Sequence, residues 1–352
     1  MSWSGGLACL ERGRTVADRL QADAGGGSGG WIAPAGGVQS DMRTAIVVRK
    51  GGHDVSATAA TRGAPVNAMS VDVEDWFQVS AFEGHVNRAD WDGLPHRVER
   101  NVERLLDIFA AHGVHATFFT LGWVAERYPG MVRRIVAEGH ELGSHGWCHI
   151  RATQQQPDQF RADVLRTKHL LEDTAGVAVA GYRAASYSIG ETNLWALEVL
   201  AETGHRYSSS IYPIRHDLYG MPSAPRFAFA PIPEADFIEI PVTTFVLRGH
   251  KLPCGGGGFF RLFPYRFSRW AMRQVNEVDG QSCVFYFHPW EIDVDQPRQR
   301  GVGLKAQFRH YLNLGRMEQR LGRLLKDFRW NRMDEVFLGH TSGHSDARRP
   351  AS

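Results

Sequence analysis

Residues 139–149 read GHELGSHGWCH, and this stretch carries the clearest metal-binding signal in the chain. It places His145 and His149 four positions apart, directly after a short segment of strand character. If the residues after Ser144 form a helical turn, both imidazoles lie on one face and can bind the same ion. Catalytic metal sites usually add a third protein ligand, often a carboxylate, and leave one position open. The stretch therefore predicts a metal site that takes an acidic ligand from elsewhere in the chain.

A cluster of carboxylates at the end of another apolar stretch can supply this ligand. Residues 70–76 read SVDVEDW and contain Asp72, Glu74 and Asp75. On a strand, Asp72 and Glu74 project to the same side, whereas Asp75 follows where the strand should already turn. One carboxylate can bind the metal and another can act as a base toward water. Two readings without chemistry stay open: a histidine pair that binds nothing and an acidic loop that is simply solvated.

Short β-like segments alternate with longer helical ones from residue 69 onward. We expect strands over residues 69–73, 115–121, 177–182, 238–246 and 282–287. We expect helices around the apolar stripes of residues 98–109, 131–136, 160–171 and 194–200. This alternation predicts parallel strands with helices outside, as a barrel or a doubly wound sheet. The candidate residues Asp72, His145, Arg183 and His288 follow strands, and parallel barrels build their active sites at that rim.

Composition limits the classes of protein that the chain can represent. Its 352 residues are 43% hydrophobic, which suits a globular protein, and its net charge of +2 gives no sign of a nucleic-acid partner. Four cysteines without a Cys-x-x-Cys pair indicate free thiols in a reducing compartment, so the cytoplasm is the expected location. The chain shows neither an apolar core of signal-peptide length near its start nor an apolar run of about 18 residues, so we expect no membrane span.

We expect a folded barrel between two tails. Residues 1–67 are rich in Gly, Ala and Ser without periodicity and are predicted to be disordered. The barrel is expected over residues 68–292, a C-terminal helical extension over residues 293–338, and a disordered tail over residues 339–352. The segment 298–332 is basic and has an apolar stripe, which indicates a packed helix or, alternatively, contact with an anionic glycan or a lipid carrier at a membrane surface.

Three further residues after predicted strands are candidates for catalysis or binding. Arg183 can hold a carboxylate through a two-pronged hydrogen bond, although a surface ion pair is the simpler interpretation. His288 can act as a general acid near neutral pH, and alone it would more often be a core histidine. Trp290 can line a sugar pocket or cap the barrel core.

Together these motifs resemble the polysaccharide deacetylase family with a NodB homology domain, also called carbohydrate esterase family four. The resemblance covers roughly residues 69–292, through Asp72-x-Glu74-Asp75, His145-x3-His149, Arg183-x3-Tyr187 and the strand that ends at His288. The stretches at 255–262 (GGGGFFRL), 288–291 (HPWE), 296–298 and 311–314 further resemble a subgroup associated with exosortase-linked exopolysaccharide clusters.

The resemblance implies a distorted (β/α) barrel of about seven strands and a divalent metal ion, with Zn²⁺ the expected one. It implies hydrolysis of N-acetyl groups on amino sugars of a glycan. Transferred to this sequence, Asp72 is the base and Arg183 its partner, while His145 and His149 bind the metal with a following carboxylate. His288 is then the general acid, and the backbone N–H of Tyr187 contributes to the oxyanion site.

Two departures from the family pattern leave assignments open. The usual adjacent Asp pair is replaced by Asp-x-Glu-Asp, so the metal carboxylate is Glu74, favoured by strand alternation, or Asp75. Ser208 stands where an Asp often supports the acid histidine, which leaves the support of His288 unassigned.

The sequence therefore favours a metal-dependent deacetylase of an N-acetylated glycan or lipid-linked oligosaccharide in exopolysaccharide assembly. The expected contact with a membrane is peripheral. Two alternatives are a hydrolase of a small non-sugar amide on the same barrel and a glycan-binding protein without turnover.

Overall fold

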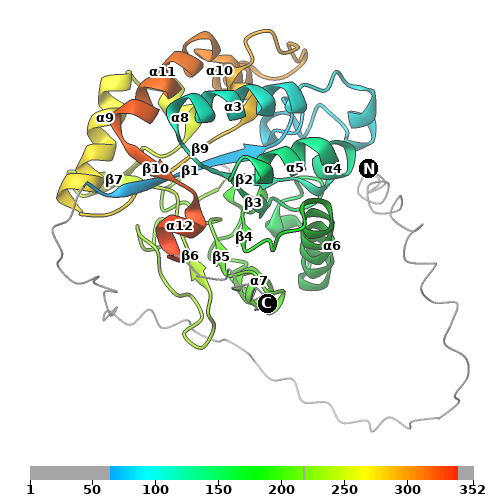
Figure 1. Cartoon of the computed structure of the whole chain (residues 1–352), viewed down its shortest axis with the longest axis horizontal. Helices are drawn as coiled ribbons and strands as arrows, with labels where there is room; N and C mark the ends of the chain where they lie inside the picture. The colour runs from blue at the N-terminus through cyan, green and yellow to red at the C-terminus, as the bar shows by residue number, and fades with distance from the viewer. Residues whose placement is uncertain (1–63, 217–218, 340–352) are drawn as a thin grey trace, which may run out of the picture. The chain divides into compact units, whose positions relative to one another are not determined.

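The computed structural model describes residues 64–216 and 219–339 (Figure 1). The predicted disordered tails therefore fall outside the described residues, apart from residues 64–67 and 339. The first strand begins at Val66, two residues before the expected boundary, and Asn67 within it is fully buried. Asn67 belongs to the fold because its side chain bonds to Asn276 and accepts the N–H of Cys283 at 2.7 Å.

One parallel sheet forms the centre of the fold. Its strands are β1 (Val66–Val73), β2 (Thr117–Thr120), β3 (Glu141–Ser144), β4 (Gly181–Tyr182), β5 (Tyr207–Ser208), β6 (Ile238–Glu239), β9 (Val284–Phe287) and β10 (Arg329–Asn331). They run in the order β10-β1-β2-β3-β4-β5-β6, and β9 pairs with β1 beside β10. The sheet curls into an incomplete barrel, which confirms the predicted distorted (β/α) barrel of about seven strands.

Helices cover the outside of this sheet (Figure 1). They include α3 (Val98–His112), α4 (Gly122–Arg127), α5 (Pro129–Ala137), α6 (Pro157–Ala175), α7 (Trp195–Glu202), α8 (Gly257–Leu262) and α9 (Tyr265–Arg273). In α3 the expected apolar stripe is buried, and Gly113 ends the helix with a φ of 62°, a left-handed conformation that glycine adopts easily. The predicted helices around residues 131–136, 160–171 and 194–200 correspond to α5, α6 and α7.

A glycine segment fills the space between β6 and β9. Gly255 accepts the N–H of Tyr286 at 2.8 Å and donates its own N–H to Thr243 at 3.3 Å. A Cβ at Gly255 would lie 2.3 Å from the carbonyl oxygen of Val284, so only glycine allows this approach. The segment follows a separate antiparallel hairpin of β7 (Thr244–Leu247) and β8 (His250–Pro253).

The prediction of one extended segment over residues 238–246 was wrong. Residues 238–239 form β6 in the central sheet, whereas residues 244–247 form β7 in the hairpin. Pro241 lies between them and has no N–H to donate to a neighbouring strand, which interrupts regular pairing.

The C-terminal residues are part of the barrel. They form α10 (Leu304–Tyr311), α11 (Leu314–Asp327) and α12 (Met333–Phe337), as the expected helical extension requires, and also the strand β10. Residues 329–331 of β10 pair in parallel with residues 66–68 of β1, while α11 packs against α3, α8 and α9. The sequence analysis missed β10 because its three residues are too short to show a pattern.

Two expectations about the environment of the chain can be compared with the structure. Cys254 and Cys283 are buried free thiols, but Cys148 is disulfide-bonded, so the expectation of free thiols does not hold for Cys148. No helix over the described ranges is long and apolar enough to cross a bilayer.

The close packing of β4 on β5 can be tested at Gly181. A Cβ there would lie 2.3 Å from the ring of Tyr207, whose hydroxyl donates to Glu141 at 2.8 Å. We expect Gly181→Ala to lower the free energy of unfolding by about 1–3 kcal/mol through overpacking. Urea unfolding measures this change, with Gly84→Ala as the control because nothing lies within 4 Å of a Cβ at Gly84. Equal stability of the two variants would contradict the observed packing.

Candidate metal centre and active site

The carboxyl ends of the central strands surround a hollow of about 160 Å³. The side chains that line it are Asp72, Glu74, Val79, Ser80, His145, His149, Ser186, Tyr187, Tyr219, Tyr286, His288 and Trp290. Asp72 lies in β1 and Glu74 directly follows it, so both carboxylates project to the same side, as strand alternation predicted. The structure thus brings together at one rim most of the site residues expected from sequence.

The two histidines converge through a loop, and the expected helical turn is absent from this described segment. β3 ends at Ser144, after which Gly146 has a φ of 74° and His149 a φ of 52°. These left-handed residues fold the chain back, so the two imidazole centres lie 5.4 Å apart. Asp163 of α6 fixes the loop by accepting the N–H of Trp147 at 3.1 Å.

Glu74, His145 and His149 form a group that fits a metal ion. Their nearest ligand atoms all lie within 4.8 Å of one another, and all three side chains are buried. His145 donates its Nδ1–H to the carbonyl of Arg183 at 2.8 Å, which leaves Nε2 as the free ligand atom. Glu74 Oε2 lies 3.2 Å from His149 Nε2 but accepts no hydrogen bond from the residues that the structure describes. A cation would satisfy this buried oxygen.

The charge states of these groups also suit a metal. Burial lowers the pKa of His149 to about 4, so its imidazole is neutral near pH 7 and can bind a metal. Burial alone would raise the pKa of Glu74, but the neighbouring His149 and His288 lower it to about 2. A carboxylate and two neutral imidazoles are a common ligand set for catalytic zinc.

Asp75, the alternative metal carboxylate, has a different role. Its Oδ1 accepts the N–H of Trp76 at 2.8 Å, and its Oδ2 accepts the N–H groups of Arg97 at 2.6 Å and Val98 at 3.0 Å. Asp75 therefore holds the first turn of α3, where N–H groups lack partners within the helix. Burial raises the pKa of Asp75, and these three backbone donors oppose the rise.

Asp72 is held by Arg183. Nη1 of Arg183 donates to Asp72 Oδ1 at 2.7 Å and to Ser70 Oγ at 2.8 Å, while Nε and Nη2 donate to the backbone and side chain of Ser209. Arg183 has no exposed surface. Burial opposes its charge, but the Asp72 carboxylate outweighs this effect and raises the pKa of Arg183 above its ordinary value. The second oxygen of Asp72 remains directed at the hollow.

His288 lines the hollow close to the carboxylates of Glu74 and Asp72. Its Nε2 is 3.0 Å from Glu74 Oε1 and 4.0 Å from Asp72 Oδ2. Its Nδ1 donates to Glu291 Oε1 at 2.9 Å. Burial would lower the pKa of His288, but Glu74 and Glu291 raise it above the ordinary value.

Ser208 does not support His288. Ser208 lies in β5, and its hydroxyl donates to the hydroxyl of Ser210 at 2.7 Å. The carboxylate that bonds to His288 comes from Glu291, three residues along the chain.

Both residues assigned to substrate binding line the hollow, but the backbone N–H of Tyr187 has another contact than expected. The backbone N–H of Tyr187 is donated to Ala184 at 3.0 Å within a tight turn, so in this structure it does not face the hollow. The Tyr187 hydroxyl instead lies 3.5 Å from Asp72 Oδ2. Trp290 lines the hollow but is only 5% exposed, because its ring stacks between His288 and His310. The Trp290 ring lies closer to His310, with centroids 4.1 Å apart, than to His288, with centroids 5.1 Å apart.

Sequence reasoning missed the partners of His288. Glu291 was visible in the quoted HPWE stretch, where a histidine and a glutamate three positions apart signal a short capped turn. Arg261 was also visible, in GGGGFFRL, but its contact with Glu291 joins residues 30 positions apart. No local pattern reports such a pairing.

The fold and the site are those of a (β/α) barrel whose rim carries a cluster that could hold a metal ion, a buried aspartate paired with an arginine, and a histidine. Comparisons with known sequences agree with this description. Residues 90–208 match the family described as polysaccharide deacetylase, and residues 209–338 match a domain of unknown function, DUF3473. The first match contains His145, His149 and Arg183, while the second contains His288 and Glu291.

Individual relatives share this family. The chain is 35% identical over 123 residues to a peptidoglycan-N-acetylglucosamine deacetylase of Bacillus cereus, covering 34% of this chain and 44% of the relative. It is 32% identical over 97 residues to a chitooligosaccharide deacetylase of Bradyrhizobium, covering 28% and 42% of the two chains. The alignments thus span less than half of either relative.

A solved structure agrees with the fold. A crystal structure from Mycobacterium smegmatis, described as a polysaccharide deacetylase, superposes with a TM-score of 0.52 at 20% identity and covers 79% of this chain and 91% of that one. The match to the polysaccharide deacetylase family thus covers residues 90–208, and the fold of the described residues agrees with that of a solved structure described as a polysaccharide deacetylase.

The separate roles of the two neighbouring carboxylates can be tested. We expect Asp75→Asn to cost about 1–3 kcal/mol of stability, because it leaves buried N–H groups of α3 without an acceptor, while metal binding persists. Glu74→Gln should lose the metal with little change in stability of the metal-free protein. Thermal unfolding and metal analysis by emission spectroscopy separate the two effects. A metal-free but stable Asp75→Asn protein would show that Asp75 binds the ion.

The histidine ligands allow a second test. His145→Ala and His149→Ala should each weaken Zn²⁺ binding by more than about 100-fold, since losing a ligand costs more than losing a ligand's outer partner. Competition with a chromogenic chelator measures the affinity. His85→Ala is the control, because His85 is exposed and outside the hollow. Unchanged affinity in either ligand variant would show that the metal lies elsewhere.

Proposed function

We propose that this protein is a metal-dependent hydrolase that removes N-acetyl groups from amino sugars of a glycan. One observation supports this most directly. Asp72, held by Arg183, and His288 face each other across one hollow, with their nearest atoms 4.0 Å apart, beside the Glu74, His145 and His149 cluster. Amide hydrolysis requires a base for water and an acid for the leaving amine, and this pair supplies both.

Asp72 is the proposed base. Its Oδ1 is fixed by Arg183, so Oδ2 can accept a proton from the water that attacks the acetyl carbonyl. The ion pair with Arg183 holds the Asp72 carboxylate in a fixed orientation, as a base requires. The attack forms a tetrahedral carbon with one new C–O bond.

His288 is the proposed acid. Its Nε2 faces the hollow, where it can donate a proton to the amide nitrogen as the C–N bond breaks. The products are acetate and a free amine on the sugar. Asp72 and His288 thus move one proton each, and no further reactant besides water is consumed.

Glu74, His145 and His149 would hold the divalent ion, for which we propose Zn²⁺. Bound there, the ion would polarise the acetyl carbonyl and lower the pKa of water, the chemistry that zinc supplies in hydrolases. The Nδ1–H bond from His145 to the carbonyl of Arg183 links this ligand to the residue that holds the base.

The proposed substrate is an N-acetylated glycan of an exopolysaccharide pathway, free or lipid-linked. The names of the Bacillus and Bradyrhizobium relatives support an N-acetylated sugar polymer. The sequence resemblance to an exopolysaccharide subgroup supports the pathway. Exposed Leu304 and Phe308 on the basic α10 support a peripheral contact with a membrane that carries the lipid-linked form.

Acetate release tests this proposal. The Zn²⁺-loaded protein should release acetate from chito-oligosaccharides or from a lipid-linked N-acetylated oligosaccharide in vesicles, and the preferred form identifies the substrate. Asp72→Asn should keep its metal while turnover falls roughly 10²–10⁴-fold, the range for losing a positioned proton-transfer group.

Two results would replace the proposal. Release from small amides such as acetanilide alone would indicate a hydrolase of non-sugar amides. A metal-loaded protein that binds these glycans without releasing acetate would indicate a glycan-binding protein.

A further inference from the structure

The buried carboxylate of Glu291 contacts His288. Glu291 has no exposed surface, and its Oε1 accepts both the Nδ1–H of His288 at 2.9 Å and the backbone N–H of the same residue at 3.1 Å. We propose that Glu291 is the positioning residue for His288 and that Arg261 holds Glu291 in place. This inference rests on the proposed function, in which His288 donates the proton.

The turn that carries Glu291 makes this contact local. Residues 289–292 form a single short helical turn with Pro289 at its start, and Glu291 caps this turn by accepting the backbone N–H of His288. Because one oxygen binds both the backbone and the ring of His288, the side chain cannot rotate about its first bonds without losing a hydrogen bond. The ring is therefore fixed relative to the end of β9.

Arg261 holds the other oxygen of Glu291. Its Nε donates to Oε2 at 2.6 Å, and its Nη atoms donate to the carbonyls of Arg309, His310 and Leu312 at 2.6–3.1 Å. Arg261 is only 2% exposed, so this charge is kept in the interior by these acceptors. The guanidinium thereby links Glu291 to the end of α10.

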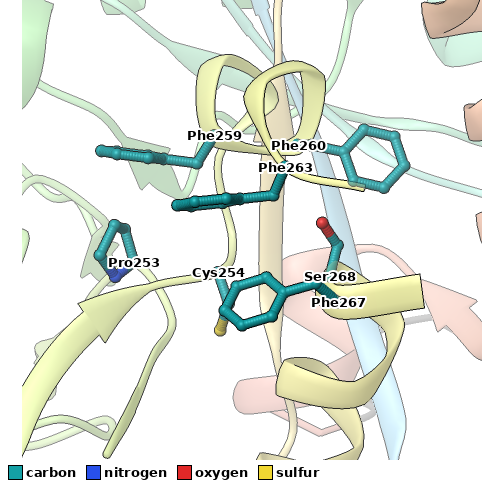
Figure 2. A pocket seen from close by; sticks show the side chains of 7 residues that line it. All are labelled: Pro253, Cys254, Phe259, Phe260, Phe263, Phe267 and Ser268. Atoms are coloured by element: carbon teal, nitrogen blue, oxygen red, sulfur yellow. The ribbon is translucent and has the colours of Figure 1, made fainter. Parts of the chain in front are cut away.

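The helix that carries Arg261 is itself fixed by aromatic rings. Figure 2 shows Phe259 and Phe263 of this segment lying one above the other, while Phe260 points to the other side. Phe260 packs edge-on against Phe285 of β9 at 5.1 Å. Rings on both sides of α8 therefore keep Arg261 in register with the strand that ends at His288.

Glycine at position 257 leaves room for Glu291. A Cβ at Gly257 would lie 2.3 Å from Oε1 and 2.5 Å from Oε2. The adjacent Gly258 has nothing within 4 Å of a Cβ. Only Gly257 of these two glycines is needed to leave room for the Glu291 carboxylate. Alanine at position 257 and alanine at position 258 therefore form a matched pair of variants.

These contacts fix which nitrogen of His288 carries the proton and how its ring is oriented. With Nδ1–H bound to Glu291, the reactive nitrogen is Nε2, which faces Glu74 and Asp72. The ring of Trp290 stacks on His288 with centroids 5.1 Å apart and planes 18° apart. Glu291 thus supplies the support for the His288 ring that Ser208 does not supply.

Kinetics of variants test the positioning role. Glu291→Gln should lower kcat about 10–100-fold, the usual cost of losing an orienting partner, with KM within about twofold and metal content unchanged. Glu291→Asp should recover part of kcat because it restores the carboxylate. Asp293→Asn is the control, since Asp293 is also buried and lies two positions further along the chain but pairs with Arg97 and Arg100.

The glycine pair displaces the carboxylate without changing its chemistry. Gly257→Ala should lower kcat by a similar factor to Glu291→Gln, while Gly258→Ala should leave it unchanged. If Glu291→Gln and Gly257→Ala both fold, keep metal and turn over at the wild-type rate, the positioning role is wrong. An equal fall in kcat in Asp293→Asn and Gly258→Ala would also overturn it, because the effect would then follow from general disruption of the segment.

A spectroscopic signature separates this inference from the proposed function. In protein labelled with nitrogen-15 histidine, His288 should give a downfield, slowly exchanging Nδ1–H resonance, identified by its loss in His288→Ala. The resonance should shift or disappear in Glu291→Gln and persist in Asp293→Asn. An unchanged resonance in Glu291→Gln overturns the inference even if the enzyme is active. A wild-type protein that shows the signature but releases no acetate overturns only the proposed function.

Discussion

The buried guanidinium of Arg183 is the contact on which the active site depends. It has no exposed surface. Its N–H groups donate to Asp72 and Ser70 of β1 and to Ser209 after β5, so it joins two separate strands of the sheet. Its own carbonyl accepts the Nδ1–H of His145. One residue thus orients both the proposed base and a proposed metal ligand. Removing one member of such a buried pair typically costs about 3–5 kcal/mol, because the other charge is left unpaired.

A second buried arginine–carboxylate pair, Arg261 and Glu291, lies next to His288. Arg261, Glu291 and His288 form a second buried chain that begins on α8 and ends at the rim after β9. In both chains an arginine with almost no exposed surface holds a carboxylate. The charges of Asp72 and Glu291 are each balanced by a guanidinium, whereas Glu74 keeps one oxygen without a donor from the described part of the chain and is the one suited to a cation.

The two matched sequence families divide the site between them. The deacetylase match ends at residue 208 and the other begins at residue 209, yet β9 pairs directly with β1 and places His288 beside Glu74. The C-terminal strand β10 pairs with the same central strand. Residues from both matches therefore line one hollow, so the C-terminal region is a structural part of this barrel and of its rim.

The sequence by itself determined the local features. The alternation of strands and helices predicted parallel strands with helices outside, as a barrel or a doubly wound sheet, because a helical crossover is what joins parallel neighbours. Strand alternation placed Asp72 and Glu74 on one side, and the strand ends placed His145, Arg183 and His288 at the rim. These features follow from residues near one another in the chain, where backbone geometry alone fixes direction.

Only the tertiary structure decided between residues with the same chemistry. It placed Glu74 with His145 and His149 in a group that could hold a metal ion, and it placed Asp75 at the start of α3, where the N–H groups of residues 97 and 98 bind it. It bent the chain at Gly146 and His149 in place of a helical turn, and it turned the N–H of Tyr187 toward Ala184. It also gave His288 the support of Glu291 and Arg261, where the sequence had pointed to position 208. Each outcome depends on a partner distant in the chain or on the local backbone conformation. The sequence shows which groups can pair, but only the packed fold brings particular groups within hydrogen-bonding distance.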